Sequence, residues 1–217
     1  MLRSLKNLFA LIATLCVCQA AFSQDNANII RIADKTFSVG TYARPFRMEK
    51  MTITDPDTGP FWNWAVCIEM CLNYAGLNVS QDQVMSLVNG TPKEPLGTPS
   101  DLTFAINKTT PPAWGKPSKI YCAIANVDPD VIFDELHAGR PMIMGTGGVG
   151  TEGTAYMITA MQYTINYDTA GNMTGITPVS ITLRDPWPNG KTSQNYIWND
   201  FLAIKASLYT IKVEFKK

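Results

Sequence analysis

The stretch FWNWAVCIEMCLNYAG, residues 61–76, carries the clearest pattern in the chain. Before Gly76 its central part contains neither proline nor glycine, and its apolar residues recur with the spacing of a helix that buries one face. Gly76 follows where a glycine in the left-handed conformation commonly ends a helix. The pattern therefore predicts a buried helix whose first turn carries Trp62, Asn63 and Trp64.

The beginning of the chain has the composition of a secretory signal peptide. Arg3 and Lys6 precede an apolar run over residues 8–17, and small side chains follow at the positions that a signal peptidase reads. That run is too short for a permanent membrane anchor. We expect cleavage near Ser23 and a mature protein that is secreted or periplasmic. We expect a signal peptide over residues 1–23, an extended N-terminal segment over 24–60 that packs on the body, and one domain over 61–217.

Charge is balanced, with 18 basic and 18 acidic residues in the full chain. Losing Arg3 and Lys6 with the leader leaves 16 basic against 18 acidic residues. The sequence contains no basic run or stripe, which argues against nucleic acid and anionic membrane as partners. No second long apolar segment follows the leader, so we expect no transmembrane anchor.

Three cysteines, Cys67, Cys71 and Cys122, remain after the leader is removed. The first two are one helical turn apart, with Cβ atoms roughly 5–6 Å apart, which exceeds the roughly 3.5–4.5 Å of a disulfide. Cys122 could pair with either, or all three could be buried reduced thiols. The only possible site of cysteine and histidine ligands would combine these thiols with His137, and the two helical cysteines face the core. We expect no metal and no cofactor.

The periodicity predicts an α+β domain with a helical first part and an antiparallel sheet after Gly139. Ser80 and Gln83 form a capping box at the start of a second helix, and Asp128 precedes another helix that starts with proline. Beyond Gly139 the apolar period changes to two. The expected helices cover residues 64–75, 81–88, 100–107 and 130–137, and the expected strands cover 119–125, 141–145, 155–166, 177–184 and 208–215.

The stretch 61–76 resembles the nucleophile helix of papain-like cysteine peptidases, especially a branch of bacterial secreted and double-glycine-leader peptidases. The nucleophilic cysteine of that family falls on Asn63, whose carboxamide neither ionises nor attacks an acyl carbon. The resemblance implies a papain-like fold in which the helical part precedes the sheet. The matching residues are Trp62, Trp64, Ala65, Cys67, Ile68, Glu69, Met70, Leu72, Asn73, Tyr74 and Gly76.

Two later segments resemble the other parts of the papain-like triad. GTAYMITA, residues 153–160, is similar to the strand that carries the catalytic histidine, which falls on Thr154. RDPWPNG, residues 184–190, is similar to the family's Asp-Pro-Trp-Pro turn and retains Asp185. The oxyanion donor of the family is often a glutamine, but the nearest polar candidate here is Asp57. The resemblance thus implies a catalytic site that has lost its nucleophile and base.

The leading hypothesis is a secreted papain-like pseudopeptidase that binds a peptide or protein in the former active-site cleft. A first alternative is an active cysteine hydrolase or peptidase that uses either Cys67 with His137, the only histidine of the chain, or an unrecognised site. A second is a structural exported domain without a ligand.

Other residues could line the cleft. Glu152 follows a glycine-rich loop and could pair with Asp185 in the manner of a glycosidase, although a solvated loop charge explains it more simply. Trp62, Trp64 and Trp187 could form a ligand platform or simply pack in the core.

Overall fold

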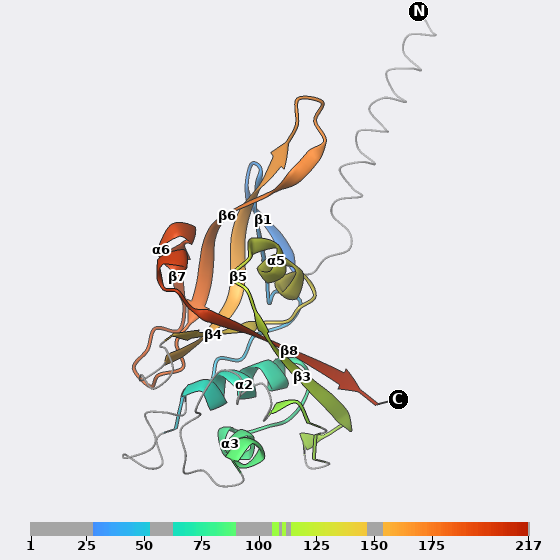
Figure 1. Cartoon of the computed structure of the whole chain (residues 1–217), viewed down its shortest axis with the longest axis vertical. Coiled ribbons are helices and arrows are strands. Elements are labelled where there is room, and N and C mark those ends of the chain that lie inside the picture. The colour runs from blue at the N-terminus through green and yellow to red at the C-terminus, as the bar shows by residue number, and fades with distance from the viewer. Residues whose placement is uncertain are drawn as a thin grey trace, which may run out of the picture.

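The computed structural model describes residues 28–52, 63–89, 106–108, 110–111, 114–146 and 154–216. Within these ranges the chain forms a mixed α+β structure (Figure 1). Its elements, in chain order, are β1 (Ile29–Ala33), β2 (Thr36–Gly40), α2 (Asn63–Tyr74), α3 (Gln81–Asn89), β3 (Ser118–Ala125), α5 (Pro129–His137), β4 (Met142–Thr146), β5 (Thr154–Tyr167), β6 (Met173–Arg184), β7 (Gln194–Ile197), α6 (Trp198–Ala203) and β8 (Ser207–Phe215).

Eight strands form one sheet in which every described pairing is antiparallel. The main path runs β1-β2-β5-β4-β8-β3. The long strand β5 organises it: along one edge its first half pairs with β4 and its second half with β2. The other edge of β5 pairs with β6, which in turn pairs with β7. A register shift between Ile158 and Ala160 leaves Thr159 without an opposite partner in β6.

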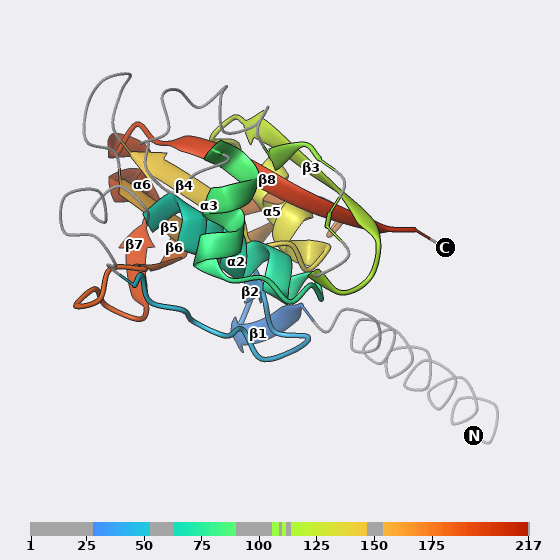
Figure 2. The same cartoon turned by 90° about the horizontal axis from the view of Figure 1, so that it is seen from below.

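The sheet separates two apolar layers. Met142 and Met144 belong to one buried cluster and Ile143 to the other, as expected when successive strand residues point to opposite faces. One layer joins the sheet to α2 and α3, which lie side by side across it (Figure 2). The other layer joins it to α5 and α6. The two layers contain nearly all the fully buried side chains among the described residues.

Helix α2 is buried on almost every side, not only on the face that its periodicity marked. Ten of its twelve residues are buried. The helix ends at Tyr74, and Gly76, two residues later, has φ +101°, a left-handed conformation that glycine adopts without a Cβ penalty. The capping box that starts α3 is confirmed: Ser80 N–H donates to Gln83 Oε1 (2.9 Å), and Gln83 N–H donates to Ser80 Oγ (3.4 Å).

Several sequence-based expectations need correction. The helices do not all precede the sheet, because β1 and β2 come before α2, whereas β3 confirms the strand expected at residues 119–125. Strand β7 and helix α6 lie in a segment for which the pattern predicted no element, and α6 has only six residues and no side-chain cap. The segment expected to be merely extended contains the β1–β2 hairpin, which is part of the sheet. The expected signal peptide and most of the expected helix at 100–107 lie outside the described residues.

Residues 41–52, here called the strap, run from the end of β2 to the region around α2. The strap begins with a bond from Thr41 N–H to the Thr159 carbonyl (2.9 Å). At its far end Met51 N–H donates to the Pro186 carbonyl (2.7 Å). Thr52 N–H donates to Gln81 Oε1 (3.1 Å), and Gln81 Nε2 donates to the Thr52 carbonyl (3.0 Å). The strap therefore ties the sheet, the turn after β6 and the start of α3 together.

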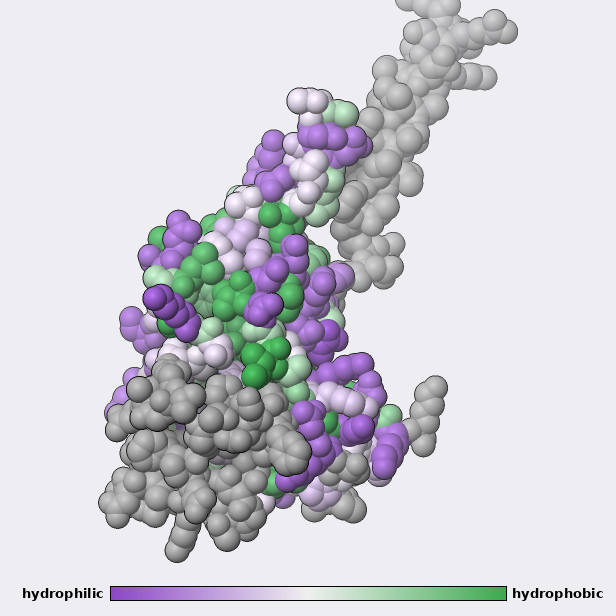
Figure 3. Space-filling view, in the orientation of Figure 1, coloured by the Kyte–Doolittle hydropathy of each residue, from purple (hydrophilic) through white to green (hydrophobic). Residues whose placement is uncertain are grey.

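The described part of the chain contains no helix both long and apolar enough to cross a membrane. On the face shown in Figure 3, hydrophobic residues gather in the middle, with hydrophilic residues around and between them. Among the described residues, the large apolar side chain with the greatest exposure is Ile197, next to α6, at 65%. Isolated exposed apolar side chains of this kind are common on folded proteins and indicate no particular partner.

Candidate functional site

The first turn of α2 holds two buried hydrogen-bond donors without an acceptor among the described residues. Asn63 is 1% exposed, and neither its Nδ2 nor the indole Nε1 of Trp64 has a hydrogen-bond partner in that part of the chain. An unpaired buried donor costs about 1–3 kcal/mol. Native structures rarely leave such groups unpaired without a reason. The helix start is therefore a polar position inside an otherwise apolar layer.

Asp185 follows the last residue of β6 and directs its carboxyl group into its own turn. Trp187 N–H donates to Asp185 Oδ1 (2.9 Å). The carboxyl group also packs directly against Gly190, where a Cβ atom would collide with it. Lys50 of the strap closes the turn by donating from Nζ to the carbonyls of Asp185 (2.8 Å) and Gly190 (2.7 Å). Asp185 therefore has a structural role that needs no histidine.

The turn that contains Asp185 lies near the first half of α2. Trp187 packs against the same apolar layer as Trp64 and Cys67. The negative charge of Asp185 also contributes to the raised pKa of the Cys67 thiol. The turn lies near the start of β5 as well, because Arg184 pairs with Met157 in the sheet.

Thr154 is the first residue of β5, three positions before Met157. Its carbonyl accepts a bond from Thr146 Oγ1 (3.1 Å). Among the described residues, no hydrogen bond joins the side chains of Asn63, Thr154 and Asp185 to one another. The three positions are thus in neighbouring elements without forming a bonded network.

The thiols do not form a nucleophilic site. Cys67, Cys71 and Cys122 are all free and buried. Burial, with the nearby Cys71 and Asp185, raises the pKa of Cys67 well above its usual range. Burial and Cys122 raise the pKa of Cys71, and burial raises that of Cys122 to about 12. At neutral pH these thiols are protonated, so none supplies the thiolate that nucleophilic attack requires.

The structure does not bring Cys67 and His137 together. His137 is the last residue of α5 and stacks on Phe133, with ring centroids 5.4 Å apart. Helix α5 buries Ile132 and Leu136 in the apolar layer on one face of the sheet, whereas Cys67 belongs to the layer on the other face. The sheet therefore separates the two residues of the alternative catalytic pair.

The remaining predicted residues divide into core residues and residues outside the description. Trp64 is only 8% exposed and belongs to the apolar layer, so it packs in the core instead of forming a ligand platform. Trp187 is half-buried against the same layer. Trp62, Asp57 and Glu152 lie outside the described residues.

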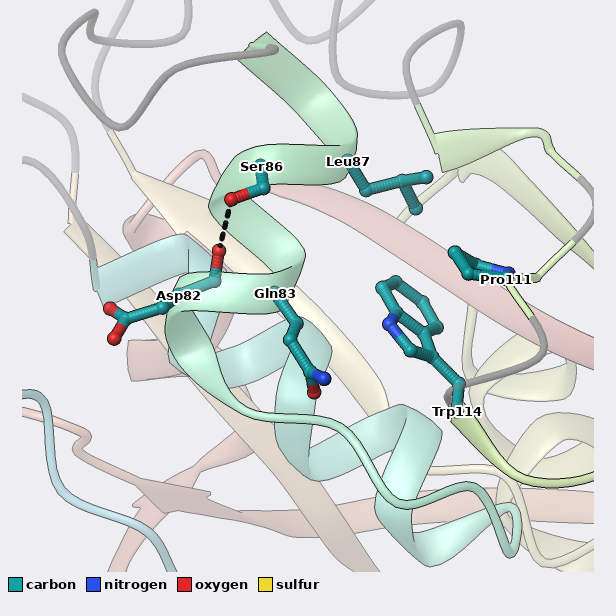
Figure 4. A pocket seen from close by; sticks show the side chains of 6 residues that line it. All are labelled: Asp82, Gln83, Ser86, Leu87, Pro111 and Trp114. Carbon is teal, nitrogen blue, oxygen red and sulfur yellow. Dashed lines mark hydrogen bonds between the residues drawn. The ribbon is translucent and has the colours of Figure 1, made fainter.

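One surface cavity of about 360 Å³ lies between α3 and the segment around Trp114. Figure 4 shows Leu87 and Pro111 at one end and the Gln83 amide at the other, with the Trp114 indole between them. Its polar groups are largely engaged: Ser86 Oγ donates to the Asp82 carbonyl (2.9 Å), and Gln83 Oε1 accepts from Ser80. The arrangement offers an apolar slot with few free polar groups.

A second cavity, of about 470 Å³, lies between the strap and the strands β5 and β6. Arg44 and Arg184 line it, and sequence reasoning singled out neither residue for a function. A single arginine in a strand or loop has no signature in one sequence, so no local pattern could have found them. Neither cavity is lined by Asn63, Thr154 or Asp185.

The comparisons with known proteins add no family. The chain matches no protein-family model and no curated protein sequence. Within the described residues, no group of three or more histidine, cysteine, aspartate or glutamate side chains is arranged to hold a metal ion. The papain-like resemblance therefore rests on the motifs around Asn63, Thr154 and Asp185 alone.

Proposed function

We propose that this chain is an exported papain-like pseudopeptidase, which binds an extended peptide or protein segment at the start of α2 and does not cleave it. The unpaired Nδ2 of Asn63 carries the proposal, because it is a buried donor at the position where the family places its nucleophile. A peptide carbonyl is an acceptor that this donor could use. The amide would then hold a ligand where a thiolate would have attacked it.

The absence of a usable nucleophile supports binding over hydrolysis. Asn63 cannot form a covalent acyl intermediate. The raised pKa of Cys67 leaves no thiolate at neutral pH, and the sheet lies between this thiol and the imidazole of His137. The proposal includes an opening step, because Asn63 is only 1% exposed and the side chains over it must separate before a ligand can bind.

The substitution Asn63→Leu tests the proposal with two readouts of opposite sign. Leucine has a similar size but no amide, so it removes a buried unpaired donor, and we expect the free energy of unfolding to rise by about 1 kcal/mol. The same change removes the donor that the ligand uses. We expect binding of fluorescein-labelled peptides, selected from a synthetic library on the unmodified protein, to weaken about fivefold to tenfold.

Asn78→Leu is the matched control, because Asn78 is exposed in the loop between α2 and α3. This variant should bind the peptides as tightly as the unmodified protein, as measured by fluorescence anisotropy. Its change in the free energy of unfolding should be smaller than that of Asn63→Leu. If the selected peptides bind the Asn63→Leu variant as tightly as they bind the unmodified protein, their binding site is not at the start of α2. If no peptide from the library binds, the chain is better described as an exported structural domain. Rapid alkylation of Cys67 by iodoacetamide below neutral pH would instead support the hydrolase alternative.

A further inference from the structure

The cavity between the strap and the sheet contains two arginines that have no carboxylate partner among the described residues. Of the five described arginines, three form ion pairs: Arg31 with Asp34, Arg47 with Glu49, and Arg140 with Glu135. The other two, Arg44 and Arg184, both line this one cavity. None of the residues known to line it is acidic. The two unpaired cations therefore occur at the same place.

Arg184 is held in a fixed position. Its Nε donates to Thr159 Oγ1 (3.0 Å), its Nη1 donates to the Thr192 carbonyl (3.4 Å), and its guanidinium lies over the Phe46 ring, 5.3 Å from the centroid. These contacts leave Nη2 without a partner among the described residues. Burial lowers the pKa of Arg184, as expected for a cation partly withdrawn from water, and the nearby Tyr42 acts in the opposite direction. Such a preorganised guanidinium matches the two oxygens of an oxyanion.

Arg44 supplies a second positive charge from the strap. Its guanidinium lies 4.3 Å from the centre of the Tyr74 ring, near the end of α2, and the side chain is exposed. Cation–π contacts hold an arginine in place without neutralising it. Two like charges that line one cavity repel each other, and an anion between them converts that repulsion into attraction.

The hydroxyl groups of the cavity wall are already engaged, so the arginines are its free polar groups. Thr41 Oγ1 donates to the Thr159 carbonyl (3.4 Å), and Thr182 Oγ1 donates to Asn195 Oδ1 (2.8 Å). Tyr42 Oη is bonded to Ser38 Oγ (2.7 Å). Phe46 and Ala160 contribute apolar surface beside the guanidinium of Arg184. The wall thus combines a flat apolar part with two unneutralised cations.

We propose that this cavity binds an oxyanion, a carboxylate or a phosphate, carried by a small ligand whose apolar part packs on Phe46. The volume of about 470 Å³ is within the range of small-molecule sites. This site is separate from the start of α2, and it stands or falls independently of peptide binding there.

Titration of the full chain with inorganic phosphate and with benzoate tests the proposal and separates the two anion types. Benzamide, which has the ring of benzoate but no charge, is the ligand control. We expect at least one anion to bind in isothermal titration calorimetry and benzamide not to bind. Arg184→Gln and Arg44→Gln should each weaken that binding at least tenfold, since each removes one charge-assisted contact.

Arg31→Gln is the matched control, because Arg31 lies on β1 and is neutralised by Asp34. It should leave anion affinity unchanged. If Arg184→Gln does not fold, the Nε–H resonance of Arg184 in the unmodified protein provides a second readout, and it should shift on anion addition. Absence of binding by both anions overturns the proposal. Equal affinity in the Arg44→Gln and Arg31→Gln variants, or equal binding of benzoate and benzamide, overturns it too.

Discussion

The start of α2 and the cavity lined by Arg44 and Arg184, here called the arginine cavity, differ in whether a sequence motif marks the chemistry found there. The start of α2 lies in the segment that resembles a peptidase motif, yet it presents only neutral groups, and its two unpaired donors are buried. The arginine cavity has no motif, yet it gathers two unneutralised cations at an open surface. A motif thus indicates where a similar family places its site, whereas unpaired charge marks the place where we propose that this chain binds an anion.

Gly40→Ala should cause the largest loss of stability, at the end of β2 directly before the strap that lines the arginine cavity. A Cβ at Gly40 would lie 2.6 Å from the Thr159 carbonyl oxygen and 2.8 Å from the Ala160 Cβ, and these groups belong to the sheet and cannot move freely. We expect the free energy of unfolding, measured by urea denaturation, to fall by about 3 kcal/mol. Gly171→Ala, in open space at φ +85°, is the control and should cost about 1 kcal/mol. Similar losses in both variants would show that the end of β2 can move away from β5 at little cost.

Gly190→Ala should cause the next largest loss of stability, in the turn near the first half of α2. The new Cβ would overlap the Asp185 carboxyl group, a side chain that can yield more easily than backbone, so we expect a loss of about 2 kcal/mol. Asp185→Ala alone removes the bond from Trp187 N–H and should cost about 1 kcal/mol. In the double variant the collision disappears, so its loss should be smaller than the sum of the two. Strict additivity in this double-mutant cycle would contradict the described packing.

The smallest expected effect on stability concerns Glu69 of α2, which interacts with residues of both the strap and α3. Burial, together with the negative charge of Glu49, raises the pKa of Glu69 to about 7; Asp82 acts in the same direction, and a Gln81 hydrogen bond and Arg47 oppose it. The folded protein therefore binds this proton more tightly than the unfolded chain. Stability should fall as pH rises from about 4.5 to about 7.

Glu69→Gln removes this dependence and should stabilise the protein at pH 8 by roughly 1 kcal/mol, because partial solvent exposure screens much of the charge interaction. Melting temperatures across this pH range provide the measurement. Glu214→Gln is the control, because Glu214 is ion-paired with Lys212 at the surface and its pKa is lowered, not raised. If the two variants show the same pH dependence between pH 5 and pH 8, the burial of Glu69 has no energetic consequence.

The sequence predicts the elements whose signals are local. The apolar spacing of α2, its terminal Gly76 and the Ser80–Gln83 capping box each depend on residues within a few positions of one another, and all agree with the structure. The β1–β2 hairpin was missed because its place in the sheet depends on β5, more than a hundred residues later. The short α6 lacks a side-chain cap, so it gave no start signal.

The candidate functional site was less predictable from the sequence than the helices and strands, because it too depends on contacts between residues far apart in the chain. Residue types alone show that Asn63 cannot be a nucleophile. That its Nδ2 is buried without a partner depends on side chains packed around it from distant parts of the chain. Arg184 was read only as the neighbour of Asp185. Its relation to Arg44 arises because residues of the strap, β5 and β6 line the same cavity, and no local pattern in the sequence records that proximity.

The position of β8 in the sheet has a consequence for how the molecule assembles. Although β8 is the last strand in sequence, it lies inside the sheet, between β4 and β3, and pairs with both. Until Ser207–Phe215 is available, β3 has no described partner and the apolar layer under α2 lacks Tyr209 and Ile211. A chain growing from its N-terminus therefore cannot complete this sheet early. Folding must wait for contacts between distant segments, which makes it slow and leaves strand edges exposed to chaperones or to other unfinished chains.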